Sequence, residues 1–171
     1  QSYSTSYIKS EGSQTTRNQE TCINATPEIN SEEGTLYAEI SALADDGTNR
    51  IISLSDGTAA NMLLILYQVG SNVIRTQLSV AGQSNIVIDV NSDTTILSKI
   101  AVNYNSTSVK LYLNGSKVGE TSTNYTFSSN TLDNLSFTYG SGILPFFGNT
   151  KDLKYYPKAL SDAELIKLTT I

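Results

Sequence analysis

The residue types that most often carry enzyme chemistry are scarce in this sequence. It contains no histidine and one cysteine, Cys22. Without histidine, the Ser-His-Asp triad, the Cys-His pair and most zinc sites are excluded. Cys22 has no second cysteine for an internal disulfide, and we interpret it as a small buried side chain.

Paired carboxylates are the other route to chemistry on sugars, because glycoside hydrolysis needs an acid and a nucleophile or base at a set separation. No strand of this sequence carries such a pair. Glu32-Glu33 and Asp45-Asp46 fall in expected turns, and Glu39 stands alone in its strand. We therefore predict that the protein is not an enzyme. A polysaccharide lyase using tyrosine with arginine or lysine stays open, since ten tyrosines are present.

Aromatic and planar polar side chains in the middle of the chain favour sugar binding instead. Aromatic faces stack on sugar C–H surfaces, and Asn, Gln and Arg form hydrogen bonds with hydroxyls. In residues 73–80 apolar and polar residues alternate, which predicts Arg75 and Gln77 on an outward face. Residues of the two preceding strands are expected beside them. The alternative is a solvated sheet face. The predicted glycan-binding residues are Arg50, Asn61, Tyr67, Arg75 and Gln77.

Metal binding has weaker support. Asp56 and Asp93 lie at expected loops and could offer the hard oxygen ligands that calcium prefers. The alternative is that both aspartates are turn formers. No cofactor other than calcium is indicated.

The elements that position these residues are short strands, because apolar residues recur with period two between turn residues. A parallel α/β sheet is disfavoured, since helical segments do not alternate with the strands. About ten strands at this spacing predict a sandwich or barrel. The expected strands are residues 34–43, 50–55, 61–68, 73–80, 85–90, 96–104, 108–115, 117–122, 132–140 and 150–157.

The end of the chain has a different pattern. Ser161 followed by Glu164 is a capping box, and it predicts one short helix over residues 161–170. Leu160 before the cap and Leu165 after it fit a hydrophobic staple. This signal is structural and carries no information on a ligand.

Length and charge narrow the classes of protein. The chain has 171 residues, which favours one domain over residues 1–171, with residues 1–33 as an extended segment packed on it. The net charge of −5 disfavours nucleic acid and anionic membrane surfaces as partners. No apolar run approaches the roughly 18 residues that a membrane span needs, so membrane insertion is not expected.

Three stretches resemble a known family. The segment GNTKDLKYYPKALSDAELIKLT (residues 148–169) is similar to the closing strand and helix of concanavalin A-like lectin/glucanase (laminin-G-like) domains. LYLNGSKVG (111–119) resembles a strand and turn of the same domains. YSTSYIKSEGSQTTRNQETC (3–22) resembles their opening segment in phage tail or virion proteins and in bacterial surface or polysaccharide-acting proteins.

The resemblance implies an all-β, two-sheet antiparallel jelly-roll sandwich with one short C-terminal helix. It also implies a non-catalytic, lectin-like module of a virion or extracellular protein, attaching a larger multidomain or multimeric assembly to surface polysaccharide. A structural or adhesion domain that contacts proteins without binding sugar is the alternative, and a polysaccharide-degrading enzyme comes third. The fold hosts many activities, so the site must decide between them.

Overall fold

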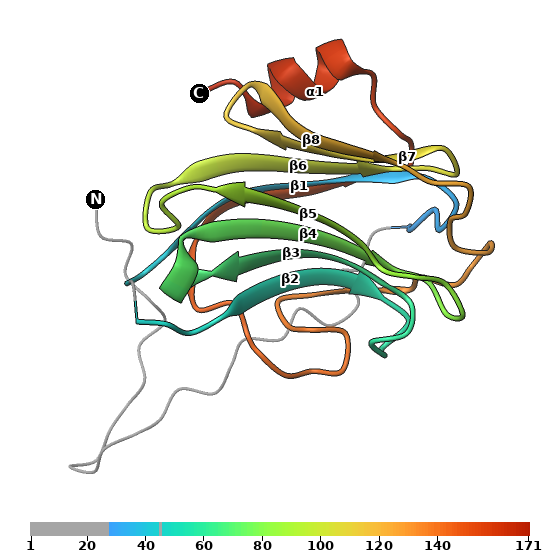
Figure 1. Cartoon of the computed structure of the whole chain (residues 1–171), viewed down its shortest axis with the longest axis horizontal. Helices are drawn as coiled ribbons and strands as arrows, with labels where there is room; N and C mark the ends of the chain where they lie inside the picture. The colour runs from blue at the N-terminus through green and yellow to red at the C-terminus, as the bar shows by residue number, and fades with distance from the viewer. Residues whose placement is uncertain (1–27, 45) are drawn as a thin grey trace.

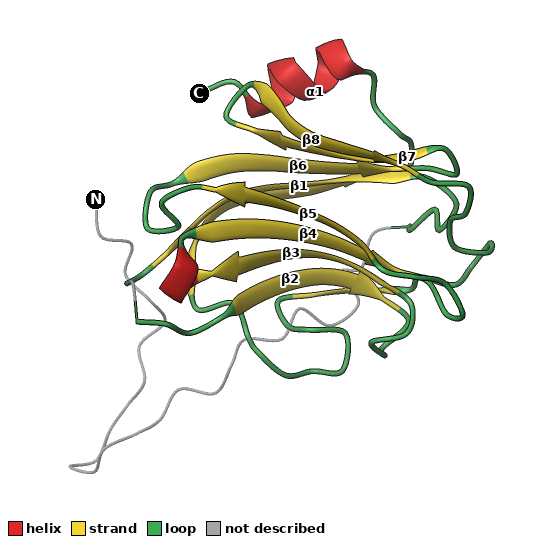
Figure 2. Cartoon of the chain, in the orientation of Figure 1, coloured by secondary structure: helices red, strands yellow, loops and turns green. Residues whose placement is uncertain are grey.

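Two antiparallel sheets of five strands stack face to face in the described part of the chain, with one helix outside the first sheet (Figures 1 and 2). The computed structural model describes residues 28–44 and 46–171. The first sheet has the order β10-β1-β6-β7-β8, and the second has the order β5-β4-β3-β2-β9. This confirms the prediction of a jelly-roll sandwich with a short C-terminal helix.

The observed elements lie close to the expected ones, except that the strand expected over residues 132–140 is observed as three residues, Asn134–Ser136. The first sheet consists of β10 (Gly148–Tyr156), β1 (Gly34–Ala42), β6 (Ser98–Tyr104), β7 (Ser108–Leu113) and β8 (Ser116–Ser122). The second consists of β5 (Ile86–Asn91), β4 (Val73–Ser79), β3 (Met62–Gln68), β2 (Arg50–Ser55) and β9 (Asn134–Ser136). A 3-10 turn, η1 (Val69–Ser71), joins β3 to β4, and helix α1 (Asp162–Thr169) follows β10.

The main core lies between the sheets and follows the period of two. In β1, Leu36, Ala38 and Ile40 are fully buried and point toward the second sheet. Burying a large aliphatic side chain stabilises the fold by about 1.5–3 kcal/mol. The sheets also meet where β5 packs on β8: a Cβ at Gly119 would lie 2.2 Å from Cγ2 of Ile88. Any larger residue at position 119 would push these strands apart.

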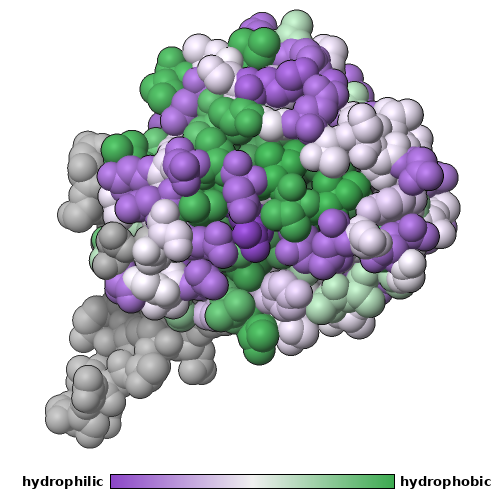
Figure 3. All heavy atoms as spheres, in the orientation of Figure 1, coloured by the Kyte–Doolittle hydropathy of each residue, from purple (hydrophilic) through white to green (hydrophobic). Residues whose placement is uncertain are grey.

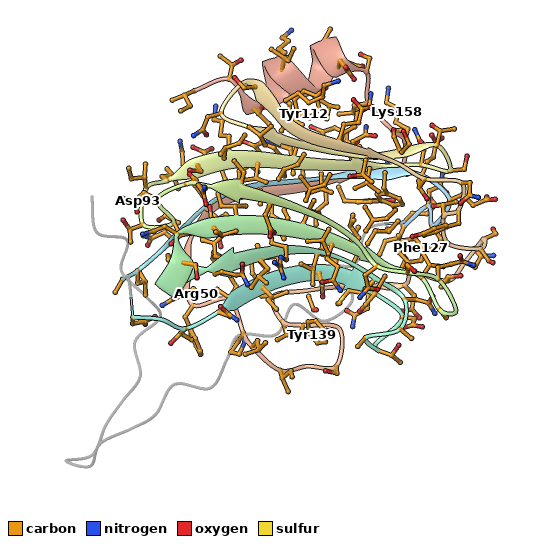
Figure 4. All side chains as sticks on the ribbon, viewed as in Figure 1. Arg50, Asp93, Tyr112, Phe127, Tyr139 and Lys158 are labelled. Atoms are coloured by element: carbon orange, nitrogen blue, oxygen red, sulfur yellow. The ribbon has the colours of Figure 1, made fainter. Side chains whose placement is uncertain are left out.

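Helix α1 covers part of the outer face of the first sheet, and Figure 4 shows Tyr112 beneath it. Leu165 is fully buried there with Tyr37, Ala101 and Tyr112. The predicted capping box is present, since Ser161 accepts a hydrogen bond from the Glu164 amide while the Glu164 carboxylate accepts one from the Ser161 amide. The capping box thus correctly predicts where the helix starts.

The residues Asn114-Gly115 form the turn between β7 and β8, and this dipeptide is typical of a tight hairpin turn. Both residues have positive φ, 48° and 84°, as a two-residue type I′ hairpin requires. The Asn114 side chain accepts a hydrogen bond from the Lys99 amide (2.8 Å), which fixes the turn to β6.

Two expectations fall largely outside the described residues. Cys22 and most of the predicted 1–33 segment belong to residues 1–27. The last part of that segment is anchored on the sandwich: the Asn30 carbonyl accepts hydrogen bonds from the hydroxyls of Tyr104 (2.7 Å) and Tyr155 (2.8 Å).

Candidate functional site

The outer face of the second sheet carries the polar residues that the sequence singled out. On β4, the inward-facing Ile74 and Leu78 are fully buried, while Arg75 and Gln77 alternate with them and point outward. In register, Arg75 lies between Leu66 of β3 and Asp89 of β5. Figure 3 shows hydrophobic and hydrophilic side chains mixed across the middle of one face of the molecule.

Arg75 and Asp89 form the strongest polar feature of this face. The Arg75 guanidinium donates two parallel hydrogen bonds to the Asp89 carboxylate, both 2.7 Å long. These bonds lower the pKa of Asp89, so the pair is ionised at neutral pH. Both side chains stay accessible, with exposed fractions of 29 % and 42 %. The pair thus presents fixed donors and acceptors to solvent, as sugar hydroxyls require.

Gln77 extends the polar strip along β4. Its side-chain amide donates to the Ser79 hydroxyl (2.8 Å), which leaves the amide oxygen as an acceptor. In register it lies between Leu64 of β3 and Val87 of β5, and Val87 is 42 % exposed. An apolar surface therefore adjoins the polar strip.

A loop over residues 137–147 brings an aromatic ring onto the same face. Tyr139 packs on Met62, Leu64 and Leu66, which are outward-facing residues of β3, and on Ile51 of β2. The Gly140 amide donates to the Met62 sulfur (3.3 Å), which holds the loop against the sheet. Figure 4 shows Tyr139 outside β2. Because Leu64 and Leu66 pair with Gln77 and Arg75, the half-buried ring lies about one strand from both polar residues.

Sequence reasoning missed Tyr139. It had predicted an aromatic on this face but chose Tyr67. Tyr139 falls in the strand expected over residues 132–140, but the observed strand ends at Ser136 and Tyr139 lies in the loop that follows, so a period of two does not give the direction of its side chain. Both the odd and the even positions of β3 are apolar, which is an indirect sign that another segment covers its outer face.

The prediction that Tyr67 faces outward is wrong. Tyr67 is fully buried in the core between the sheets, and its hydroxyl donates to the Ile40 carbonyl (3.0 Å). The physical reason is the register, since Tyr67 pairs with the inward-facing Ile74. Its ring contacts Phe146 edge to face and is not available to a sugar.

Arg50 and Asn61 were also predicted to bind glycan, but their side chains form hydrogen bonds with loop residues instead. Arg50 is 2 % exposed, and its guanidinium donates to the carbonyls of Phe147 and Thr48 and to the Asp46 carboxylate. It therefore ties two loops together at the start of β2 (Figure 4).

Asn61 closes the loop between β2 and β3. Its amide nitrogen donates to Asp56 (2.8 Å) and its oxygen accepts from the Ala81 amide (3.0 Å). Of the five predicted residues, the structure brings together Arg75 and Gln77 on the open face.

The two calcium candidates make turn contacts. Asp56 accepts from the amide and hydroxyl of Thr58 and from Asn61, and Asp93 accepts from the amide and hydroxyl of Thr95. Across residues 28–44 and 46–171, no three potential ligands from Cys, Asp or Glu lie close enough to hold a metal ion. Such contacts are typical of turn-forming aspartates, which is the alternative to calcium binding.

The carboxylates of the first sheet are paired with cations. Glu39 is buried on the outer face and accepts from Lys151 at 2.7 Å, while the neighbouring Asp152 is bonded to Lys154. Each carboxylate thus has a lysine partner. Within the described residues, no helix is long and apolar enough to span a membrane.

Comparison with known proteins assigns the family. The family model described as the concanavalin A-like lectin/glucanases superfamily matches residues 14–166. The chain therefore belongs to the concanavalin A-like lectin/glucanase superfamily. No curated protein sequence matches it.

Solved structures show the same fold at low identity. The chain is similar to the leech intramolecular trans-sialidase (TM-score 0.68, 21 % identity), covering 82 % of this chain and 24 % of the leech protein. It thus spans about a quarter of that enzyme. It is also similar to the CBM40 of a Ruminococcus gnavus IT-sialidase, solved with α2,3-sialyllactose (TM-score 0.66, 19 % identity, 81 % and 83 % covered). A heptameric pentraxin from Limulus polyphemus is a more distant likeness (TM-score 0.55, 13 % identity, 85 % and 76 % covered).

Proposed function

We propose that the protein is a non-catalytic carbohydrate-binding module that uses the outer face of β3, β4 and β5 to hold a surface glycan. The observation that carries the proposal is the placement of the Tyr139 ring beside the Arg75–Asp89 pair and Gln77 on an otherwise open face. A ring and a fixed array of hydrogen-bonding groups are the two elements of sugar recognition.

The family and its structural neighbours support this proposal. One neighbour of similar length is a carbohydrate-binding module solved with sialyllactose. The pairing of Glu39 and Asp152 with lysines is unsuited to an acid and base of a glycosidase, which supports binding without cleavage. We place the module in an extracellular or virion protein, where it would attach a larger assembly to polysaccharide.

A glycan array followed by affinity gel electrophoresis on the best polysaccharide tests the proposal. We expect the wild type to be retarded, and the Arg75→Ala and Tyr139→Ala variants to be retarded less. Lys117→Gln is the matched control, because Lys117 is an exposed cation on β8 of the other sheet. Unchanged retardation of both face variants would overturn the assignment of this face. Release of reducing ends or unsaturated products from that polysaccharide would overturn the non-catalytic part.

A second candidate function is protein contact without sugar. Four apolar side chains are exposed at one end of the first sheet, where β1 ends and β6 and β10 begin. They are Leu43, Ile96, Leu97 and Phe147. Exposed apolar clusters mark contact sites. This function predicts that Leu43→Lys changes association of the protein, measured by sedimentation, without changing retardation by polysaccharide.

A further inference from the structure

A cavity of about 470 Å³ opens between helix α1 and the end of β10, on the opposite side of the sandwich from the proposed sugar-binding face. This volume lies within the range of roughly 300–1,000 Å³ that is usual for small-molecule sites. The lining residues are Tyr156, Lys158, Leu160, Glu164, Lys167 and Leu168. Figure 4 shows Lys158 beside the start of α1.

The local structure explains why these residues converge. Glu164, Lys167 and Leu168 are spaced i, i+3 and i+4 on α1, so they share one face of the helix. Tyr156 is the last residue of β10, and Lys158 lies in the connection that leads back to the helix. The capping box fixes where the helix starts, and Glu164, one of its two residues, lines the cavity.

The lining combines an apolar wall with two cations. Tyr156, Leu160 and Leu168 pack against the cluster beneath α1 and present partly buried apolar surface. The Lys158 side chain is 62 % exposed, and its Nζ lies 3.8 Å from Glu164 Oε1, beyond hydrogen-bond distance. Lys167 forms no ion pair with any described residue. Both ammonium groups therefore keep donors available to a ligand.

Glu164 offsets one of these two positive charges. Its Oε2 accepts hydrogen bonds from the Ser161 amide (2.8 Å) and hydroxyl (2.7 Å). One carboxylate oxygen thus serves the helix cap. With two lysines and one carboxylate, the cavity has a net charge of +1.

The chain has a net charge of −5, and most of the lysines around the cavity are neutralised by ion pairs. Seven of the eight lysines lie between residues 99 and 167, and these seven lie on or beside the sheet face that carries α1. They are Lys99, Lys110, Lys117, Lys151, Lys154, Lys158 and Lys167. Because Lys110, Lys117, Lys151 and Lys154 are each paired with a carboxylate, the positive charge that can attract an anionic ligand is that of the cavity itself.

We propose that this cavity is a second binding site, for a saccharide that carries a carboxylate. The ammonium groups of Lys158 and Lys167 bind the carboxylate, and the apolar face of the sugar ring lies on Tyr156, Leu160 and Leu168. The site is separate from the face of Arg75 and Gln77, and it does not depend on that face binding a glycan.

Isothermal titration with 3′-sialyllactose and lactose tests the chemistry, because the two probes differ by one acidic sugar. Trigalacturonate and neutral galactotriose form a second matched pair. We expect the acidic member of at least one pair to bind more tightly than its neutral counterpart. The affinity should fall as NaCl is raised, since salt screens the lysines.

Variants locate the site. Lys158→Gln and Lys167→Gln should each weaken binding of the acidic probe about tenfold, the usual effect of losing one hydrogen bond to a charged group. Lys117→Gln on the same sheet and Arg75→Ala on the other sheet should leave this binding unchanged. Neither substitution changes a core residue. Circular dichroism spectra and the midpoint of thermal unfolding check that each variant folds.

The proposal fails if neither acidic probe binds, if the neutral probes bind as tightly, or if both cavity variants bind like the wild type. Loss of binding in Arg75→Ala alone would assign the acidic sugar to the other face and overturn this second site. Conversely, failure of the Arg75 face in affinity electrophoresis leaves the titration result unaffected, so the two proposals fail separately.

Discussion

The outer faces of the two sheets are covered in different ways. On the first sheet, helix α1 places the fully buried Leu165 on Tyr37 and Tyr112 and closes the middle of the face. On the second sheet, the loop over residues 137–147 places one half-buried ring on β2 and β3, and β4 and β5 stay open. The capped helix closes the middle of its sheet and leaves a cavity beside the end of β10, whereas the loop with a single aromatic ring leaves β4 and β5 open.

The largest effect on the free energy of unfolding is expected at Leu165, the residue through which α1 covers the first sheet. Leu165→Ala should lower the free energy of unfolding by about 2–4 kcal/mol, because it removes buried contacts beneath the helix and leaves a cavity. Urea denaturation measures the change. Its control is Ile166→Ala, since Ile166 is 44 % exposed and should cost much less. Equal losses in the two variants would mean that α1 does not seal the sheet through Leu165.

A smaller effect is expected at the helix cap. Ser161→Ala removes the hydroxyl that accepts from the Glu164 amide, and it should cost about 1 kcal/mol. Ser161→Asp keeps a capping oxygen and should retain most of the stability. Thermal denaturation of the two variants compares them. If alanine and aspartate behave alike, the cap does not hold the helix on the sheet.

The free energy of unfolding should also depend on pH through Asp162, at the start of the helix. The hydrogen bond from Lys110 (2.7 Å), with a second contact from Lys117 (3.3 Å), lowers the pKa of Asp162 from 3.8 to about 2. The depressed pKa means that this contribution is present above the unfolded value and is lost as the pH falls from about 4 to about 2. Urea unfolding of the wild type and Asp162→Asn across that range should show a smaller loss for the variant. Parallel curves would contradict the assignment.

The smallest effect on stability is expected on the open face. Arg75→Ala breaks an exposed ion pair with Asp89, so it should change the free energy of unfolding by less than about 1 kcal/mol. The reduced glycan retardation expected of this variant would then be a binding effect. A larger loss of stability in urea would show that the pair stabilises the fold, as the contacts beneath α1 do on the first sheet.

The sequence predicted most strands and one part of the site. Arg75 and Gln77 were placed correctly because β4 alternates between apolar and polar residues, so its two faces are visible in the sequence. Tyr67 was placed wrongly because β3 is apolar at nearly every position. A strand buried on both faces carries no such signal, and its direction follows from pairing with β4.

The sequence by itself determined what depends on near neighbours in the chain. The capping box of Ser161 and Glu164, the Asn114-Gly115 turn and the alternation of β4 each involve residues only a few positions apart. Tertiary structure decided which residues from distant segments meet: Tyr139 on β3, Arg50 at the Phe147 carbonyl, and Lys158 beside Lys167 across a cavity. Those contacts depend on how the sheets and loops stack, and local periodicity does not encode that arrangement.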